Sequence, residues 1–182
     1  MQTFSYCPKC AGALEYRTPE AHNPEAVPVC TQCGFIFWQS SKPTASGVLR
    51  DGEGRILLVE RGIEPKKGEW DLPGGFLGNG EDPMAGLKRE MREELGVTVE
   101  PDALLGIFTD TYGEGDAAIY TFNVVYSARI VSGTITPQDD VASVQWFAPD
   151  ALPDSVAFAN NKAALDALLA HLGLPQRYVV DK

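Results

Sequence analysis

Residues 75–97 read GFLGNGEDPMAGLKREMREELGV, and the pattern in this stretch decides the fold. From Asp82 to Leu95 the pattern is helical, because Asp82 is a preferred N-cap residue and Pro83 suits the first helical position. Gly96 is a typical residue at which a helix stops. The glycines before Glu81 form a loop whose backbone can approach a ligand closely. The stretch therefore predicts a tight loop followed by one helix.

The predicted helix has two chemically different faces. Glu90, Glu93 and Glu94 are spaced i, i+3, i+4, so their carboxylates are expected to converge on one face. The face suited to packing on a sheet carries Met84, Leu87, Met91 and Leu95. Crowded carboxylates repel one another unless a cation binds, and hard oxygen ligands suit Mg²⁺ or Mn²⁺. A solvated charged face is the alternative, which the nearby Arg89 and Arg92 leave open.

Strand and helix patterns alternate along the chain from about residue 43. Turn-forming residues at 51–54 separate two apolar runs, which is typical of a hairpin. Apolar residues at helical spacing predict a second amphipathic helix later in the chain. The expected strands cover residues 45–49, 55–60, 104–109, 119–130 and 144–147, and the second helix covers residues 160–172. This alternation predicts an α/β fold in which a sheet packs between helices.

The balance of charge bears on the partners of the protein. The chain has 182 residues and a formal net charge of −10. Affinity for nucleic acid rests largely on Lys and Arg that neutralise phosphates, so the composition argues against a nucleic-acid partner. If such an acidic protein handles anionic phosphates, bound divalent cations are the simplest source of local positive charge. We therefore expect a small-molecule partner and a metal cofactor.

The sequence predicts neither a membrane span nor a signal peptide. No stretch approaches the roughly 18 consecutive apolar residues that a membrane span requires. The first residues lack the basic region and the apolar run of a signal peptide. Both observations favour a cytoplasmic location with no membrane partner.

The four cysteines all lie near the start of the chain, as two C-x2-C pairs that residues 11–29 separate. They are Cys7, Cys10, Cys30 and Cys33. In a cytosolic chain this pairing indicates a tetrahedral Zn²⁺ site more than disulfides, although free or disulfide-bonded thiols are the alternative. Gly34 permits a tight knuckle turn, and a short strand is expected at residues 35–38. The segment resembles a zinc ribbon, for which its acidic balance favours a structural or dimer-forming role.

Residues 75–97 also carry a resemblance to a known family. The segment resembles the Nudix box, G-x5-E-x7-R-E-U-x-E-E-x-G-U, in which U is a bulky apolar residue. Every defined position is matched, by Gly75, Glu81, Arg89, Glu90, Met91, Glu93, Glu94, Gly96 and Val97. The preceding WDLPGG at residues 70–75 is similar to the approach strand of the family, and the resemblance covers about residues 43–172. It implies a Nudix α/β/α sandwich with a mixed sheet at residues 41–182, preceded by a small four-cysteine zinc ribbon at residues 1–40.

The resemblance implies an activity and roles for the residues of the box. Glu90, Glu93 and Glu94 would bind the divalent metals that bridge a diphosphate. Arg89 would hold and orient the glutamates by charge-assisted hydrogen bonds, and Glu81 would support the geometry of loop and helix. A metal-activated water would attack one phosphorus of a nucleoside diphosphate linked to another moiety, X, and release a nucleoside monophosphate and phosphorylated X.

The general base of this reaction stays open between the box and a later loop. Within the box, Glu93 and Glu94 are the catalytic candidates. Asp139 and Asp140 precede a segment that ends in Trp146 and Phe147, similar to a family segment in which an acidic residue precedes a strand. Asp140 would then be a further metal ligand or the base, and a solvated loop acid is the alternative.

The substrate is less closely defined than the reaction. A zinc ribbon before a Nudix domain is similar to the NADH pyrophosphatase group, but the Ser-Gln-Pro-Trp-type segment of that group is absent, and residues 107–115 stand in its place. ADP-ribose-like substrates are therefore expected, with FAD and NADH as alternatives. The candidates for substrate contact are Trp70, Phe76, Tyr112 and Tyr120 for stacking, Arg50, Arg61, Lys66 and Lys67 for phosphates, and Gly75 and Glu81 in the loop.

Two other functions are compatible with part of the sequence. Nucleoside-triphosphate cleanup would use the same chemistry on a different leaving group. A non-catalytic regulator could sense a nucleotide through the Nudix fold, but the intact box argues against it. A homodimer through the zinc ribbon is compatible with all of these functions.

Overall fold

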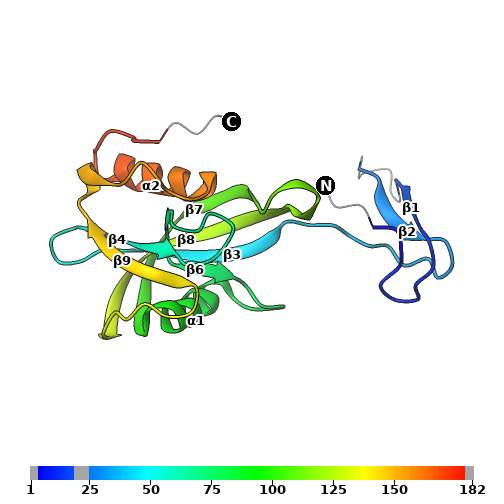
Figure 1. Ribbon diagram of the computed structural model, residues 1–182, viewed down its shortest axis with the longest axis horizontal. Helices are drawn as coiled ribbons and strands as arrows, with labels where there is room; N and C mark the ends of the chain where they lie inside the picture. Colours follow the sequence, from blue (N-terminus) through cyan, green and yellow to red (C-terminus); the bar gives the residue numbers. More distant parts are fainter. Residues whose placement is uncertain (1–3, 19–24, 179–182) are drawn as a thin grey trace. The chain divides into compact units, whose positions relative to one another are not determined.

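The structure is a computed structural model that describes residues 4–18 and 25–178. It divides into two compact units, Met1–Ser41 with Gly113–Ile119, and Lys42–Tyr112 with Tyr120–Lys182. We call them unit 1 and unit 2 and describe each by itself (Figure 1). Among the described residues, no helix has the length and apolar character needed to cross a membrane.

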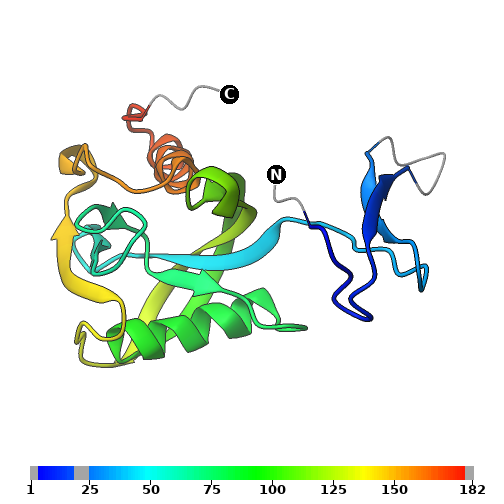
Figure 2. The same ribbon diagram turned by 45° about the vertical axis from the view of Figure 1, so that its right-hand side comes forward.

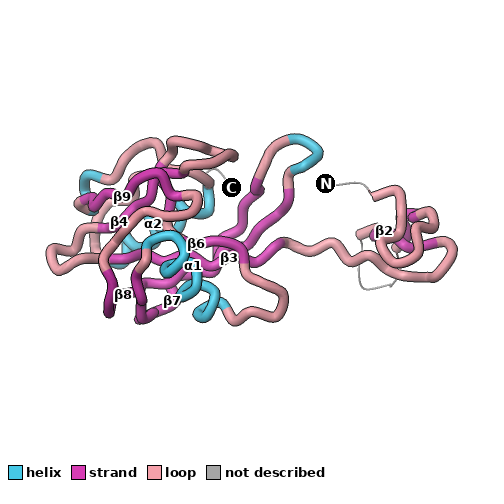
Figure 3. Tube along the Cα trace, turned by 60° about the horizontal axis from the view of Figure 1, so that its bottom comes forward, coloured by secondary structure: helices cyan, strands magenta, loops and turns pink. Residues whose placement is uncertain are grey.

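Unit 1 is built mainly of loops and a two-stranded sheet, as the colouring of Figure 3 shows. Strands β1 (Leu14–Arg17) and β2 (Val27–Cys30) pair antiparallel. The short strand expected at residues 35–38 is wrong, since Ile36 makes only an isolated bridge to Val29. The hydrogen bonds of this bridge run from the N–H of Cys30 to the carbonyl of Phe35 and from the N–H of Phe37 to the carbonyl of Pro28, and the pairing extends no further.

The predicted first helix of unit 2 is confirmed as α1 (Pro83–Leu95). The side chain of Asp82 accepts hydrogen bonds from the N–H groups of Met84 and Ala85, and Gly96 ends the helix with a left-handed φ of 68°. Leu87, Met91 and Leu95 are fully buried. The assignment of Met84 to the packed face is wrong: it is 48% exposed, because the packed face begins one turn later.

The strands of unit 2 form two sheets with a helix on either side (Figures 1 and 2). The first sheet is mixed, since β3 runs parallel to β8 and antiparallel to β6. The predicted sandwich of helices around a mixed sheet is thus confirmed. The first sheet has the order β6 (Gly74–Phe76), β3 (Lys42–Leu49), β8 (Ile119–Gly133), β7 (Val97–Tyr112), and the second has the order β5 (Trp70–Asp71), β4 (Ile56–Arg61), β9 (Val141–Phe147). The remaining elements of unit 2 are the 3-10 turn η2 (Pro149–Ala151) and the second helix α2 (Ala159–His171), whereas the 3-10 turn η1 (Gly115–Ala117) belongs to unit 1.

The hairpin expected between β3 and β4 is wrong. Only an isolated antiparallel bridge joins Arg50 to Ile56, and the two strands enter different sheets. Beyond that bridge, β3 pairs with β6 and β8, and β4 pairs with β5 and β9. Each strand therefore finds its extended partners in distant parts of the chain and not across the turn.

Two apolar clusters form the core of unit 2. The first cluster contains Leu87, Met91 and Leu95 of α1. The second contains Leu165 and Leu168 of α2, with Trp70 and Phe147 packed against it among others. Burying each such leucine stabilises the fold by roughly 1.5–3 kcal/mol. The strand layer between the clusters therefore holds both helices in place, and β6 lies within it.

Candidate active site

Glu94 is the most buried of the carboxylates of α1. It is 6% exposed, and its Oε2 accepts the backbone N–H of Gly74 at 2.9 Å. Burial raises the pKa of Glu94 well above its ordinary value, and the negative charges of Asp140 and Glu90 raise it further. The helix therefore places a carboxylate in an environment that disfavours its charge.

Arg89 is the main cation beside these carboxylates. Its Nη1 donates to Glu90 at 2.7 Å and to Glu93 at 2.8 Å. Its Nε and Nη2 bind the carboxylate of Glu81 at 2.8 and 2.9 Å, and Nη2 also donates to the carbonyl of Phe76. The hydrogen bond from Arg89, with a second from the N–H of Gly78, lowers the pKa of Glu81 to about 2. We call Glu81, Glu90, Glu93 and Glu94 the glutamate group, and Arg89 fixes the side of it that Glu81, Glu90 and Glu93 form.

Asp140 joins this group from a distant part of the chain. It precedes β9 and is half-buried. Its charge raises the pKa of both Glu90 and Glu94, although burial is the largest cause for each. Its backbone carbonyl accepts the N–H of Gly62 at 2.6 Å, which ties the loop to the end of β4. The structure therefore brings Asp140 to the glutamates of the box.

Gly74 allows β6 to lie close to β3 at this point. It has a φ of 141°, and a Cβ there would lie 2.2 Å from the carbonyl oxygen of Ala45. A side chain would therefore push β6 away from β3 and move the N–H that Glu94 accepts.

The donor set suits a divalent cation. Among the described residues, only the four cysteines bring their ligand atoms as a group within 4.8 Å of one another. Glu90 and Glu93 both accept hydrogen bonds from Arg89, whereas Glu94 accepts one from the backbone N–H of Gly74. However, burial raises the pKa of Glu90 and of Glu94, and the negative charge of Asp140 raises both further. Partly buried like charges of this kind, with oxygen donors only, fit Mg²⁺ or Mn²⁺.

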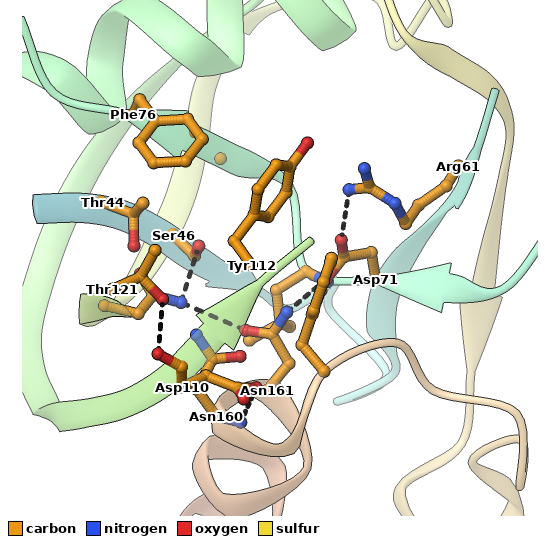
Figure 4. A pocket seen from close by; sticks show the side chains of 15 residues that line it. Thr44, Ser46, Arg61, Asp71, Phe76, Asp110, Tyr112, Thr121, Asn160 and Asn161 are labelled. Carbon is orange, nitrogen blue, oxygen red and sulfur yellow. Dashed lines mark hydrogen bonds and ion pairs between the residues drawn. The ribbon is translucent and has the colours of Figure 1, made fainter. Parts of the chain in front are cut away.

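A pocket lies beside β6 (Figure 4). It offers about 450 Å³ of space, counting its open mouth. The lining residues are Thr44, Ser46, Arg61, Asp71, Leu72, Gly74, Gly75, Phe76, Asp110, Tyr112, Thr121, Asn123, Phe158, Asn160 and Asn161.

Three aromatic rings form one wall of the pocket. The ring of Tyr112 contacts Phe76 edge-on, with centroids 5.3 Å apart, and stacks on Phe158 at 5.6 Å. The guanidinium of Arg61 lies 5.0 Å from the centroid of the Phe158 ring. Flat apolar faces beside one cation suit an aromatic base or a phosphate-bearing group.

A hydrogen-bonded network forms the polar part of the pocket (Figure 4). Asp71, which is 6% exposed, pairs with Arg61 Nη1 at 2.9 Å and accepts from the amide of Asn161. Burial raises the pKa of Asp71 to about 7, against the lowering effect of Arg61. Asn123 Nδ2 donates to Asn161 and to Ser46, so the network reaches both sheets and α2. Asp110 adds a carboxylate that accepts the N–H of Asn160 at 3.0 Å, in the first turn of α2.

The structure brings some of the candidate substrate residues together and not others. Arg61, Gly75, Phe76 and Tyr112 line the pocket. Trp70 packs edge-on against Phe147 outside the lining, because its ring belongs to the core that covers α2. Glu81 binds Arg89 in the glutamate group. Tyr120, Arg50, Lys66 and Lys67 are exposed and outside the lining.

Sequence reasoning missed most of the polar lining. Asp71, Asp110, Asn123, Asn160 and Asn161 all line the pocket, and so does the aromatic Phe158, which sequence reasoning also missed. One signal was present for Asn160 and Asn161, because two adjacent amides before an apolar helix pattern are unusual for a packed face. Asp71, directly before LPGG, stood beside the motif without a chemical reason to select it.

The four cysteines of unit 1 form a compact sulfur cluster. Their Sγ atoms all lie within 4.8 Å of one another, with Cys7 and Cys33 3.8 Å apart and Cys10 and Cys30 3.5 Å apart. Tetrahedral Zn²⁺ with Zn–S bonds of about 2.3 Å needs sulfur separations of about 3.8 Å. The N–H of Cys33 donates to Cys30 Sγ and lowers the pKa of Cys30 to about 6, against the effect of burial. The cluster therefore fits a zinc ion.

Comparison with known proteins adds independent information. A family model described as the NUDIX domain matches residues 40–169. A MutT-like protein from Streptomyces ambofaciens is 32% identical over 125 residues, which is 69% of this chain and 75% of that protein. An ADP-ribose pyrophosphatase from Methanocaldococcus jannaschii is 30% identical over 114 residues, 63% of this chain and 66% of that protein. The crystal structure of a NUDIX hydrolase from Nitrosomonas europaea is similar with a TM-score of 0.76 and 26% identity, covering 98% of this chain and 100% of that one.

Proposed function

Because this chain belongs to the NUDIX family, whose model matches residues 40–169, we propose that it is a Mg²⁺-dependent pyrophosphohydrolase. Its substrate is a nucleoside diphosphate linked to another moiety, X, and its products are a nucleoside monophosphate and phosphorylated X. ADP-ribose-like compounds are the preferred substrates. The similarity to a protein named ADP-ribose pyrophosphatase supports this choice.

One observation carries the proposal: β6 is shared by the glutamate group and the pocket. Gly74, Gly75 and Phe76 all line the pocket. The N–H of Gly74 binds Glu94, and the carbonyl of Phe76 binds Arg89. A diphosphate held at the glutamates would therefore extend along β6 and place an attached moiety against the pocket wall.

The residues of the box divide the work of holding the cation and the substrate. Glu90, Glu93 and Glu94 would bind the divalent ion, and Arg89 orients the first two through Nη1. Glu81 holds Arg89 in a bidentate ion pair and so keeps its fork aimed at the glutamates. Mg²⁺ or Mn²⁺ bound there would lower the pKa of a water molecule and neutralise charge on the diphosphate.

A carboxylate must accept the proton of the attacking water. Asp140 and the glutamates of α1 are the groups in place, and Asp140 is coupled to both Glu90 and Glu94 by charge. We assign Asp140 as a further ligand or as the base.

The pocket would hold the nucleoside or X. Phe76, Tyr112 and Phe158 offer faces on which a base can stack. Arg61 supplies the positive charge for a phosphate at the pocket mouth, held there by Asp71.

The four cysteines of unit 1 would bind one structural Zn²⁺. The zinc ribbon would then cover residues 1–40, and the catalytic domain would cover residues 41–182. Homodimer formation would be a further role of the ribbon.

The test measures release of the nucleoside monophosphate from ADP-ribose, FAD, NADH and nucleoside triphosphates, with Mg²⁺ or Mn²⁺. We expect ADP-ribose to give the highest kcat/KM. Glu93→Gln and Glu94→Gln should each lower kcat about 100-fold or more, whereas the exposed Glu114→Gln should match wild type. A triphosphate preference would assign the protein to nucleotide cleanup. Inactivity on the whole panel would overturn the enzyme assignment and favour a nucleotide-sensing role.

A further inference from the structure

Residues 174–178 follow α2 and form a segment that we call the strap (red in Figure 1). Asp166 of α2 is 5% exposed, and its carboxylate accepts the backbone N–H groups of Arg177 and Tyr178 at 2.8 to 3.1 Å. A buried carboxylate is strongly unfavourable unless its oxygens accept hydrogen bonds. The strap therefore supplies the donors that let Asp166 be buried, and Asp166 fixes the strap on α2.

The strap also holds residues 152–158, which we call the Phe158 loop. The hydroxyl of Tyr178 donates to the carbonyl of Pro153 at 2.7 Å. The side chain of Arg177 pairs with Asp154 at 2.8 Å, in an exposed contact. Burial raises the pKa of Tyr178 to about 12, so its hydroxyl is a hydrogen-bond donor at neutral pH. Tyr178 also packs against the apolar cluster that contains α2.

The Phe158 loop is fixed to β5 as well. The backbone N–H of Trp70 donates to the carbonyl of Ser155 at 3.0 Å, and the backbone N–H of Ala157 donates to the carbonyl of Trp70 at 2.7 Å. The loop ends in Phe158, whose φ is 61°. A bulky residue at positive φ persists only where its surroundings hold it. The contacts with the strap and with β5 therefore hold Phe158 in a conformation that the isolated chain would not keep.

We propose that Asp166 and Tyr178 are positioning residues: through the Phe158 loop they hold the Phe158 ring in the pocket wall and so set the affinity for the moiety bound there. The proposal rests on the proposed function of the pocket. The strap and α2 belong to the second apolar cluster, whereas α1 belongs to the first. Loosening the strap should therefore raise KM while the glutamates of α1, and with them kcat, stay nearly unchanged.

The test uses two conservative variants of the full chain. Tyr178→Phe removes one hydroxyl, and Asp166→Asn removes the charge but keeps the shape of the side chain. The matched controls are Tyr6→Phe, whose ring is 72% exposed in unit 1, and Asp150→Asn, whose side chain is exposed in η2. Steady-state kinetics on ADP-ribose with Mg²⁺ are combined with amide hydrogen exchange read by mass spectrometry.

For both variants we expect KM to rise about fivefold with kcat within about twofold of wild type, on the scale of one lost hydrogen bond. Peptides that cover residues 152–158 should exchange faster, peptides that cover 83–95 should not, and both controls should match wild type. Normal exchange in the Phe158 loop together with faster exchange in the strap would overturn the proposal. A loss of kcat with faster exchange throughout would also overturn it, since that is the signature of a merely structural role. If wild type hydrolyses no member of the panel, the proposed function fails, and exchange in residues 152–158 still decides whether the strap positions the loop.

Discussion

Gly75 and Glu90 approach so closely that a Cβ on Gly75 would lie 2.7 Å from Oε1 of Glu90. Gly75 has no positive φ, so the requirement for glycine is the contact and not the backbone conformation. Gly75 pairs with Ala45 in the sheet, which fixes its position relative to α1. The absence of a side chain at Gly75, the first residue of the box motif, thus leaves room for the Glu90 carboxylate beside β6.

Gly75→Ala should lower kcat by roughly 100-fold, because Glu90 is a proposed metal ligand and displacing such a carboxylate by about 1 Å has an effect of this size. The fold should persist, since alanine tolerates the backbone conformation. The measurement is kcat on ADP-ribose, with thermal unfolding by circular dichroism as the check on folding. Gly52→Ala is the matched control, as a Cβ there meets nothing within 4 Å. A wild-type kcat in Gly75→Ala would show that Glu90 can move without loss of activity.

Glu94→Gln should separate stability from activity. In the presence of a chelator, the variant should unfold at the same or a higher temperature than wild type, because burial and neighbouring charges disfavour the Glu94 carboxylate. The amide oxygen can still accept the N–H of Gly74. Added Mg²⁺ should raise the unfolding temperature of wild type more than that of the variant. Equal shifts with Mg²⁺ would count against Glu94 as a ligand.

The Glu81–Arg89 ion pair should make stability depend on pH in the acid range. Because the folded state lowers the pKa of Glu81 from 4.5 to about 2, its contribution to stability is complete above about pH 4.5. It is lost as the pH falls toward 2. Glu81→Gln should therefore be less stable than wild type at pH 7, and the difference should shrink between pH 5 and pH 2.

Unfolding temperatures measured across that pH range test this prediction. Glu64→Gln, at an exposed glutamate, is the control and should follow wild type throughout. A difference between Glu81→Gln and wild type that stays constant down to pH 2 would contradict the ion-pair explanation.

The cysteine cluster should bind one zinc ion per chain. X-ray absorption should find four sulfur ligands at about 2.3 Å. Cys30→Ser and Cys7→Ser should each lose the metal, because both side chains are buried in the cluster and an exposed replacement ligand cannot reach it. Purified wild type that contains no zinc after expression with zinc supplied, and takes none up after reduction, would refute the site.

The sequence predicted the ends of α1 correctly because the residues that decide them lie next to those ends in the chain. Asp82, Pro83 and Gly96 act within one turn of the helix ends, and the structure places the caps of α1 at those residues. The spacing of the box fixes which side chains α1 presents, whatever the rest of the chain does. The hairpin between β3 and β4 failed for the opposite reason, since pairing depends on which strands compete for each edge.

The candidate site divides in the same way. Arg89 and Glu81 are eight residues apart and meet by helix and loop geometry alone. The position of Asp140 before a predicted strand marks it as a candidate, and the structure puts its charge beside Glu90 and Glu94. The polar lining of the pocket joins side chains from distant segments, such as Asn161 with Asp71, which no local pattern relates.

By itself, the sequence predicted the glutamate helix and the four-cysteine cluster, because short-range spacing and side-chain chemistry are sufficient for both. Only the tertiary structure decided that β6 is shared by the glutamates and a pocket, and that Phe158 forms part of the pocket wall. The physical reason is that the pocket depends on strand pairing and on the packing of α2. Both are settled by contacts between residues far apart in the chain.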